Sequence, residues 1–311
     1  MLDPQTQLTN PAAYRQPRHA LEPHAFALET AEQWAVAKAS ALSADLFRLT
    51  SLWYIDWLVQ HQPTDRTTRY TACLAQSENY GIACGLTSVL RQSAQSVALQ
   101  EADHSLVGGD CREIIKDKRY RTDLDRTAFI DLVMGQFPVE ANDQLILNQA
   151  RGDKYKRKSQ LFADEANSVL ARKGSSTIKG NKPHALVIGA MAGTHAALLA
   201  RGFQVTATDM SPDVVGQNLG GVTVRNGSEN YTLMETADIV IVTGMAFPNG
   251  TLPSLMRAAQ NSNTSTMIWA VTGRNLGHYY TTHGIDCVIS DPAPFLQLPG
   301  PVSIGIWRRE K

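Results

Sequence analysis

The sequence predicts an α/β protein: a Rossmann-like parallel sheet with helices on both faces, preceded by a mostly helical α+β domain. Short apolar runs recur regularly after residue 180, and helix-length segments separate most of them. Continuous apolar strands that alternate with helices are typical of a parallel sheet covered on both faces. The polar, glycine-containing stretch 174–183 marks the change of pattern. We therefore expect a lid or substrate domain over 1–180 and a ligand-binding domain over 181–311.

The N-terminal part begins with a polar, proline-broken arm over residues 1–25. From 29 to 60, apolar residues recur at three- and four-residue steps, which predicts one amphipathic helix with Trp53 on its apolar face. Two short apolar runs have the length of strands, and three further amphipathic segments predict helices. The strands are expected over 70–74 and 81–84, and the helices over 89–103, 125–137 and 158–174.

Six apolar runs predict the strands of the C-terminal sheet: 184–189, 204–209, 238–243, 266–271, 286–290 and 302–307. In an open doubly wound sheet, ligands bind beyond the carboxyl ends of the strands, where the strand order reverses. The residues that follow each of these runs are therefore the candidate ligand contacts.

Composition excludes several classes of partner. Lys plus Arg and Asp plus Glu both total 29, so a formal net charge of zero gives no general attraction to nucleic acid or anionic membrane. No apolar run approaches the ~20 residues that span a bilayer, and the N-terminus lacks the apolar stretch of a secretion signal. The 4 cysteines form no C-x-x-C pair, which indicates reduced thiols. We expect a cytoplasmic protein with a small-molecule ligand, and a homodimer stays open.

The first strand ends in a glycine-bearing turn, in which Gly189, Met191 and Gly193 lead into a helix. Such a turn lets a ligand approach the backbone, and the free N–H groups of the helix attract negative charge. His195 lies in the first turn of that helix and is a candidate catalytic group. The alternative is a turn that needs glycine for its own conformation.

The second strand ends at Asp209, twenty residues after Gly189, and Met210 follows it. An acidic side chain at this position accepts hydrogen bonds from ribose hydroxyls in dinucleotide sites. The alternative is local capping, in which Asp209 or Ser211 bonds the amides of the next segment.

Polar groups also follow the later strands. Thr243, Gly244, Met245, Asn249 and Thr251 follow the third strand, 272–275 follows the fourth, and Asp291 follows the fifth. Because parallel strands end at one edge, polar groups from five successive loops converge there, and this convergence predicts the site.

Two resemblances arise from these residues. The 189–193 turn resembles the G-x-G-x-G loop of S-adenosylmethionine-dependent enzymes, with Met191 in place of the middle glycine, and 209–212 (DMSP) resembles class I methyltransferases. Residues 237–295, above all 243–251, resemble a prokaryotic family labelled "putative heavy-metal chelation". That family pairs a Rossmann-like domain with a small domain like the N-terminal part of enolase, and its label implies metal binding.

The main hypothesis is an S-adenosylmethionine-dependent transferase or cyclase of small-molecule biosynthesis. The cofactor would contact the eight positions Gly189, Met191, Gly193, Asp209, Met210, Thr243, Gly244 and Met245. His195, Asn249 and Asp291 are the predicted catalytic residues, and Thr251 and Tyr70 the predicted substrate contacts.

The alternative is a non-catalytic protein that binds a metal or a metal chelate. No closely spaced Cys, His or carboxylate motif supports a dedicated metal site, so no metal ligands are predicted. His278, His283 and Cys287 are the nearest approach to one. The basic run 154–158 either contacts an anionic group of the substrate or, by default, lies in solvent.

Overall fold

The computed structural model describes residues 21–60, 67–78, 80–89, 104–117, 122–137, 141–148, 151–174, 182–291 and 301–309. Within this part of the chain, no helix is both long enough and apolar enough to cross a membrane.

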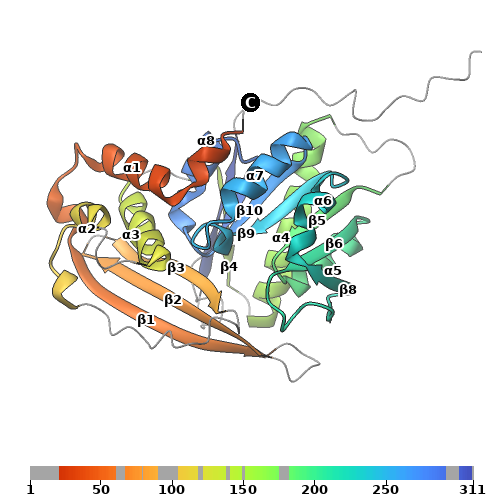
Figure 1. Cartoon of the computed structure of the whole chain (residues 1–311), viewed down its shortest axis with the longest axis horizontal. Helices are drawn as coiled ribbons and strands as arrows, with labels where there is room; N and C mark the ends of the chain where they lie inside the picture. The colour runs from red at the N-terminus through yellow and green to blue at the C-terminus, as the bar shows by residue number, and fades with distance from the viewer. Residues whose placement is uncertain are drawn as a thin grey trace, which may run out of the picture.

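The N-terminal region is built on an antiparallel sheet in the order β1-β2-β3. Helix α3 lies across one face of this sheet, and α1 and α2 lie beyond it (Figure 1). Its elements are η2 (Pro23–Phe26), α1 (Leu28–Ala39), η3 (Ala44–Phe47), β1 (Leu49–Gln60), β2 (Thr67–Ser77), β3 (Tyr80–Val89), η5 (His104–Leu106), α2 (Cys111–Lys116) and α3 (Asp123–Gly135).

The C-terminal region is built on a 9-stranded sheet. Its strands are β4 (Asp143–Leu147), β5 (His184–Ile188), β6 (Gln204–Asp209), β7 (Asn218–Leu219), β8 (Val222–Asn226), β9 (Ile239–Thr243), β10 (Ser265–Ala270), β11 (Cys287–Ser290) and β12 (Val302–Arg308). Its helices are α4 (Arg151–Arg172), α5 (Ala192–Ala200), η7 (Gly227–Glu229), α6 (Asn230–Met234), η8 (Gly244–Ala246), α7 (Leu252–Asn261), η9 (Arg274–Leu276) and α8 (Gly277–Thr282).

The strands are arranged in the order β4-β12-β11-β10-β9-β5-β6-β8-β7. The point at which the strand order reverses lies between β5 and β9. The six strands from β11 to β8 are parallel, whereas β12, β4 and β7 pair antiparallel at the edges. Helices α4 and α5 cover one face, and α6, α7 and α8 cover the other. The Rossmann-like α/β prediction is therefore confirmed, and all six predicted strands are present.

Two elements before residue 180 belong to the large sheet. Strand β4 pairs with β12, and α4 packs on α5 and on the strands. The second structural unit therefore begins before the change of sequence pattern at 174–183, because β4 and α4 precede its first parallel strand. The sequence reading also missed β4, β7 and β8.

The helix predicted over 29–60 is wrong in its second half. Helix α1 ends at Ala39, and the chain from Leu49 onward is strand β1. Successive side chains here point to opposite faces, as in a strand: Leu52 is buried toward α3, whereas Trp53 is 40% exposed. The other N-terminal predictions on described residues are confirmed, namely strands at 70–74 and 81–84 and helices at 125–137 and 158–174. Nearly all of the helix predicted over 89–103 lies outside the described residues.

The two regions share one hydrophobic core. A continuous cluster joins Phe129 of α3 to Val242 of β9 and to Tyr280 of α8. At the junction, the buried Asp131 accepts a hydrogen bond from the backbone N–H of Asn275 at 2.7 Å. The Asn275 side-chain amide also donates to the backbone oxygen of Asp131 at 2.9 Å. The shared core and this pair of bonds fix the two regions relative to each other.

Candidate functional site

The turn after β5 is shaped by the strand that neighbours it across the point of reversal. Gly189 has a φ of +107°, and a Cβ built there would lie 2.9 Å from Cγ2 of Thr243 at the end of β9. Positive φ and close contact both require glycine at this position. Gly193 has a different role: a Cβ there would overlap Oγ of Ser159, so this glycine lets α5 pack against α4. The alternative, a turn that needs glycine for its own conformation, therefore accounts for Gly189, and packing against α4 accounts for Gly193.

Asp209 links the ends of β5 and β6. Its Oδ2 accepts a hydrogen bond from the Ala190 N–H at 2.9 Å, and its Oδ1 accepts one from the Ser211 N–H at 2.8 Å. The local alternative for Asp209, bonding to Ser211, is thus present in the structure. Met210 beside it is 57% exposed, whereas Met191 is buried.

The N-terminal sheet contacts this edge through β2. Tyr70, Ala72 and Leu74 pack with Met245 and Val271 from the loops after β9 and β10. Burial, together with the negative charge of nearby Asp209, raises the pKa of Tyr70 to about 12. Tyr70 is therefore a neutral phenol at pH 7. The structure brings this predicted substrate contact next to the predicted cofactor positions.

The loop after β9 is held by its own hydrogen bonds. Asn249 Oδ1 accepts from the N–H of Thr251 at 3.1 Å and from its hydroxyl at 2.6 Å. A Cβ on Gly244 would lie 2.7 Å from the backbone oxygen of Thr272, so this loop packs closely on the next one. The N–H of Met245 is 3.5 Å from Oγ1 of Thr243.

His195 is fully buried under the turn, and both ring nitrogens bond to backbone. Nδ1 lies 2.9 Å from the oxygen of Leu219, so Nδ1–H donates and Nε2 accepts from the N–H of Met191 at 3.4 Å. Burial lowers the pKa of His195, which keeps the ring neutral at pH 7. These contacts give His195 a structural role, and its catalytic role stays a prediction.

Asp291, by contrast, lies in a charged cluster at the end of β11. Its Oδ2 accepts from Nζ of Lys158 at 3.0 Å and from Nε1 of Trp269 at 3.0 Å. Lys158 and Lys154 are 4% and 1% exposed, so the default placement of these lysines in solvent is wrong. Their i, i+4 spacing, which puts both on one face of α4, is the signal that distinguishes them from the exposed Lys156.

Among the described residues, no three His, Cys, Asp or Glu side chains gather to hold a metal ion. His283 bonds through Nδ1 to the oxygen of Tyr279 at 2.8 Å, whereas Cys287 faces Glu165. Burial, with the nearby charge of Glu165, raises the pKa of Cys287 well above its usual range. The Cys287 thiol is therefore not prepared to bind a cation, whereas the Nε2 of His283 lies 4.0 Å from Oε2 of Glu22.

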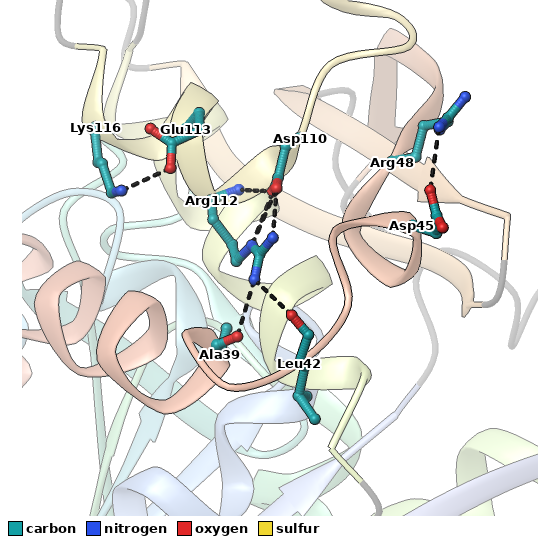
Figure 2. Close-up of polar contacts among 8 residues, drawn as sticks. All are labelled: Ala39, Leu42, Asp45, Arg48, Asp110, Arg112, Glu113 and Lys116. Atoms are coloured by element: carbon teal, nitrogen blue, oxygen red, sulfur yellow. Dashed lines mark hydrogen bonds and ion pairs between the residues drawn. The ribbon is translucent and has the colours of Figure 1, made fainter.

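Asp110 and Cys111, a second pair of potential ligands, serve the N-terminal fold. The Asp110 carboxylate bonds to the guanidinium of Arg112, which also donates to the backbone oxygens of Ala39 and Leu42 (Figure 2). These bonds attach the end of α1 to α2. Burial raises the pKa of the Cys111 thiol to about 12, so it stays protonated.

Comparison with known proteins supports one of the two resemblances. Residues 177–272 match the model of the DUF364 family, described as "Putative heavy-metal chelation". Nothing in the match supports a methyltransferase motif. No curated protein matches the chain.

Two solved structures of DUF364 proteins of unknown function are similar to this chain. The protein from Pyrococcus horikoshii is 12% identical, with a TM-score of 0.52, over 90% of this chain and 99% of that one. The protein from Desulfitobacterium hafniense is 14% identical, with a TM-score of 0.46, over 89% of this chain and 98% of that one. The first likeness shows a shared fold and nothing beyond it.

Proposed function

We propose that this protein binds a heavy-metal chelate, a metal ion already held by a small organic molecule, at the carboxyl edge of the large sheet. The observation that carries the proposal is the family match, which covers the strand ends that form this edge from Gly189 to Thr272. In Rossmann-like sheets this edge, next to the reversal between β5 and β9, is where ligands bind.

The donor set favours a chelate over a bare ion. A bare heavy-metal ion needs several Cys, His or carboxylate ligands at one point, and the described residues offer no such group of three. A chelate brings its own ligands and needs only polar and apolar contacts from the protein. Tyr70, Met245 and Val271 supply an apolar and aromatic wall, and Asp209 supplies charge beside it.

Titration calorimetry with two nickel probes tests this proposal. We expect preformed nickel–citrate to bind the full chain, and nickel chloride alone to bind at least about tenfold more weakly, since one lost charged hydrogen bond alone has that effect. Met245→Asp should weaken chelate binding, because it places a charge in the apolar wall. Exposed Asp153→Asn is the matched control and should change nothing. Tighter binding of the bare ion, or binding of neither probe, would contradict the proposal.

A second candidate is binding of S-adenosylmethionine, as in a transferase or cyclase. The observation that favours it is the position of Asp209 at the end of β6, beside the Gly189 turn and the strand reversal. Ribose hydroxyls are held by an acidic side chain at this place in nucleoside sites. Titration with S-adenosylmethionine tests it: binding should be lost in a folded Asp209→Ala variant. Full affinity in that variant would reject this candidate.

A further inference from the structure

Helix α4 carries two lysines into the interior of the protein. Lys154 and Lys158 are 1% and 4% exposed, whereas Tyr155 between them is 36% exposed. Ammonium groups are rarely buried without a partner because desolvation penalises the charged form. The position of these lysines beside the strand ends therefore needs a physical reason.

Lys158 has one hydrogen-bonding partner in the described part of the chain. Its Nζ donates to Oδ2 of Asp291 at 3.0 Å, and it lies 4.3 Å from the ring centroid of Trp269 and 5.1 Å from that of Tyr155. An ammonium group has three N–H donors. Two donors of Lys158 thus have no oxygen or nitrogen acceptor among the described residues.

Asp291, in turn, uses one of its two carboxylate oxygens as a hydrogen-bond acceptor within the described part of the chain. Both of its side-chain hydrogen bonds, from Lys158 and from Trp269, reach Oδ2. Its Oδ1 accepts no hydrogen bond from the residues that the structure describes, although the side chain is 1% exposed. A self-sufficient buried ion pair would use both oxygens and most of the N–H groups.

This cluster is separate from the residues at the strand reversal. Asp291 follows β11 and Asp209 follows β6, and β10, β9 and β5 lie between these two strands. Four strand spacings correspond to about 19 Å along the edge. Trp269 is partly exposed, and so is Tyr155, so the cluster lies one side chain below the surface.

We propose that Lys158 and Asp291 bind the free α-aminocarboxylate group of an amino acid, a second ligand distinct from the proposed chelate. The ligand carboxylate accepts the two remaining N–H bonds of Lys158, and its ammonium group donates to Oδ1 of Asp291. The rings of Trp269 and Tyr155 cover the cation. This inference goes beyond the proposed function, because it assigns a second ligand to a cluster about 19 Å along the same edge from Asp209.

A zwitterion fits this cluster better than a simple anion does. A carboxylate or phosphate alone satisfies Lys158 and leaves Asp291 Oδ1 beside a second negative charge, which is unfavourable. A diamine satisfies Asp291 but places a second positive charge beside Lys158, which is also unfavourable. Only a group with both charges a few ångströms apart completes both partners.

Calorimetry of the full chain with L-histidine and with nickel–citrate tests the inference. We expect Asp291→Asn, which keeps the shape of the side chain, to weaken L-histidine binding at least about tenfold. Nickel–citrate binding, at the separate site beside Tyr70 and Met245, should not change. Lys158→Met should weaken L-histidine binding as well, and exposed Lys156→Met should leave it unchanged. Circular dichroism of each variant checks the fold, and Asp291→Asn decides the question if Lys158→Met fails to fold.

The outcomes separate this inference from the proposed function. Binding of nickel–citrate without binding of histidine, or histidine affinity that ignores Asp291→Asn, overturns the inference alone. Histidine binding that depends on Asp291, with nickel–citrate unbound, keeps the inference and overturns the proposed function.

Discussion

Two parts of the same sheet edge, the strand reversal and the end of β11, use their polar groups differently. At the strand reversal, both oxygens of Asp209 bond to backbone amides, both nitrogens of His195 are bonded, and Asn249 bonds to Thr251. At the end of β11, Lys158 and Asp291 bond to each other, and among the described residues two Lys158 donors and Oδ1 of Asp291 have no hydrogen-bonding partner. The polar groups at the strand reversal hold the loops in place. Those at the end of β11 keep hydrogen-bonding capacity for a ligand.

This difference bears on how a site is recognised. Glycines, an acidic residue and a histidine near strand ends predict a cofactor loop, yet each of those residues has a sufficient structural role here. Incomplete hydrogen bonding in a buried charged pair is more specific, because native structures leave few buried polar groups unsatisfied. Three variants test whether the contrast between the two regions holds.

The largest expected effect is on the charged cluster. Lys158→Met leaves Asp291 buried without its cation and should lower the free energy of unfolding by about 3–5 kcal/mol. Lys158→Met combined with Asp291→Asn should restore much of that loss, because no unpaired charge then remains. Urea unfolding of both variants and of Lys156→Met measures the coupling. Equal losses in the single and double variants would show that packing, and not charge, sets the cost.

Replacement of the glycine at the strand reversal should cost somewhat less. Gly189→Ala places a methyl group 2.9 Å from Cγ2 of Thr243 at a positive φ, and we expect a loss of about 2–4 kcal/mol. Gly202→Ala is the control, since Gly202 also has a positive φ but no heavy atom within 4 Å of its Cβ. That variant should lose only about 1 kcal/mol. Similar losses in urea unfolding would mean that contact with Thr243 is unimportant.

The sequence predicted the Rossmann-like sheet well because six apolar runs alternate with helices, and four of the six form strands buried on both faces. It was wrong about β1 because residues four apart, such as Trp53 and Trp57, share a face in a helix and also in a strand. The boundary near residue 180 followed the linker, whereas β4 and α4 join the large sheet through contacts distant in sequence.

The sequence predicted the sheet edge at which the candidate site lies, but it did not predict the contacts within the site. The position of Asp291 at a strand end follows from the alternation of strands and helices. Its partner Lys158 comes from a helix 133 residues earlier in the chain, and no local pattern links the two. The burial of His195 likewise depends on the backbone of Leu219, which lies on a strand that the sequence did not indicate.

The smallest effect concerns the proton of Tyr70, which reports the distance between the N-terminal sheet and the strand reversal. Burial, with the charge of Asp209, raises its pKa to about 12, so the folded state keeps this proton above pH 10 while the unfolded state releases it. Stability therefore falls as pH rises from 10 toward 12. Asp209→Asn removes the charge but not the burial, so the pKa should fall and stay above 10. Ultraviolet titration of tyrosinate in this variant, against Tyr70→Phe to assign the signal, measures the shift. An unchanged pKa would place Asp209 too far from Tyr70 to act with it on one ligand.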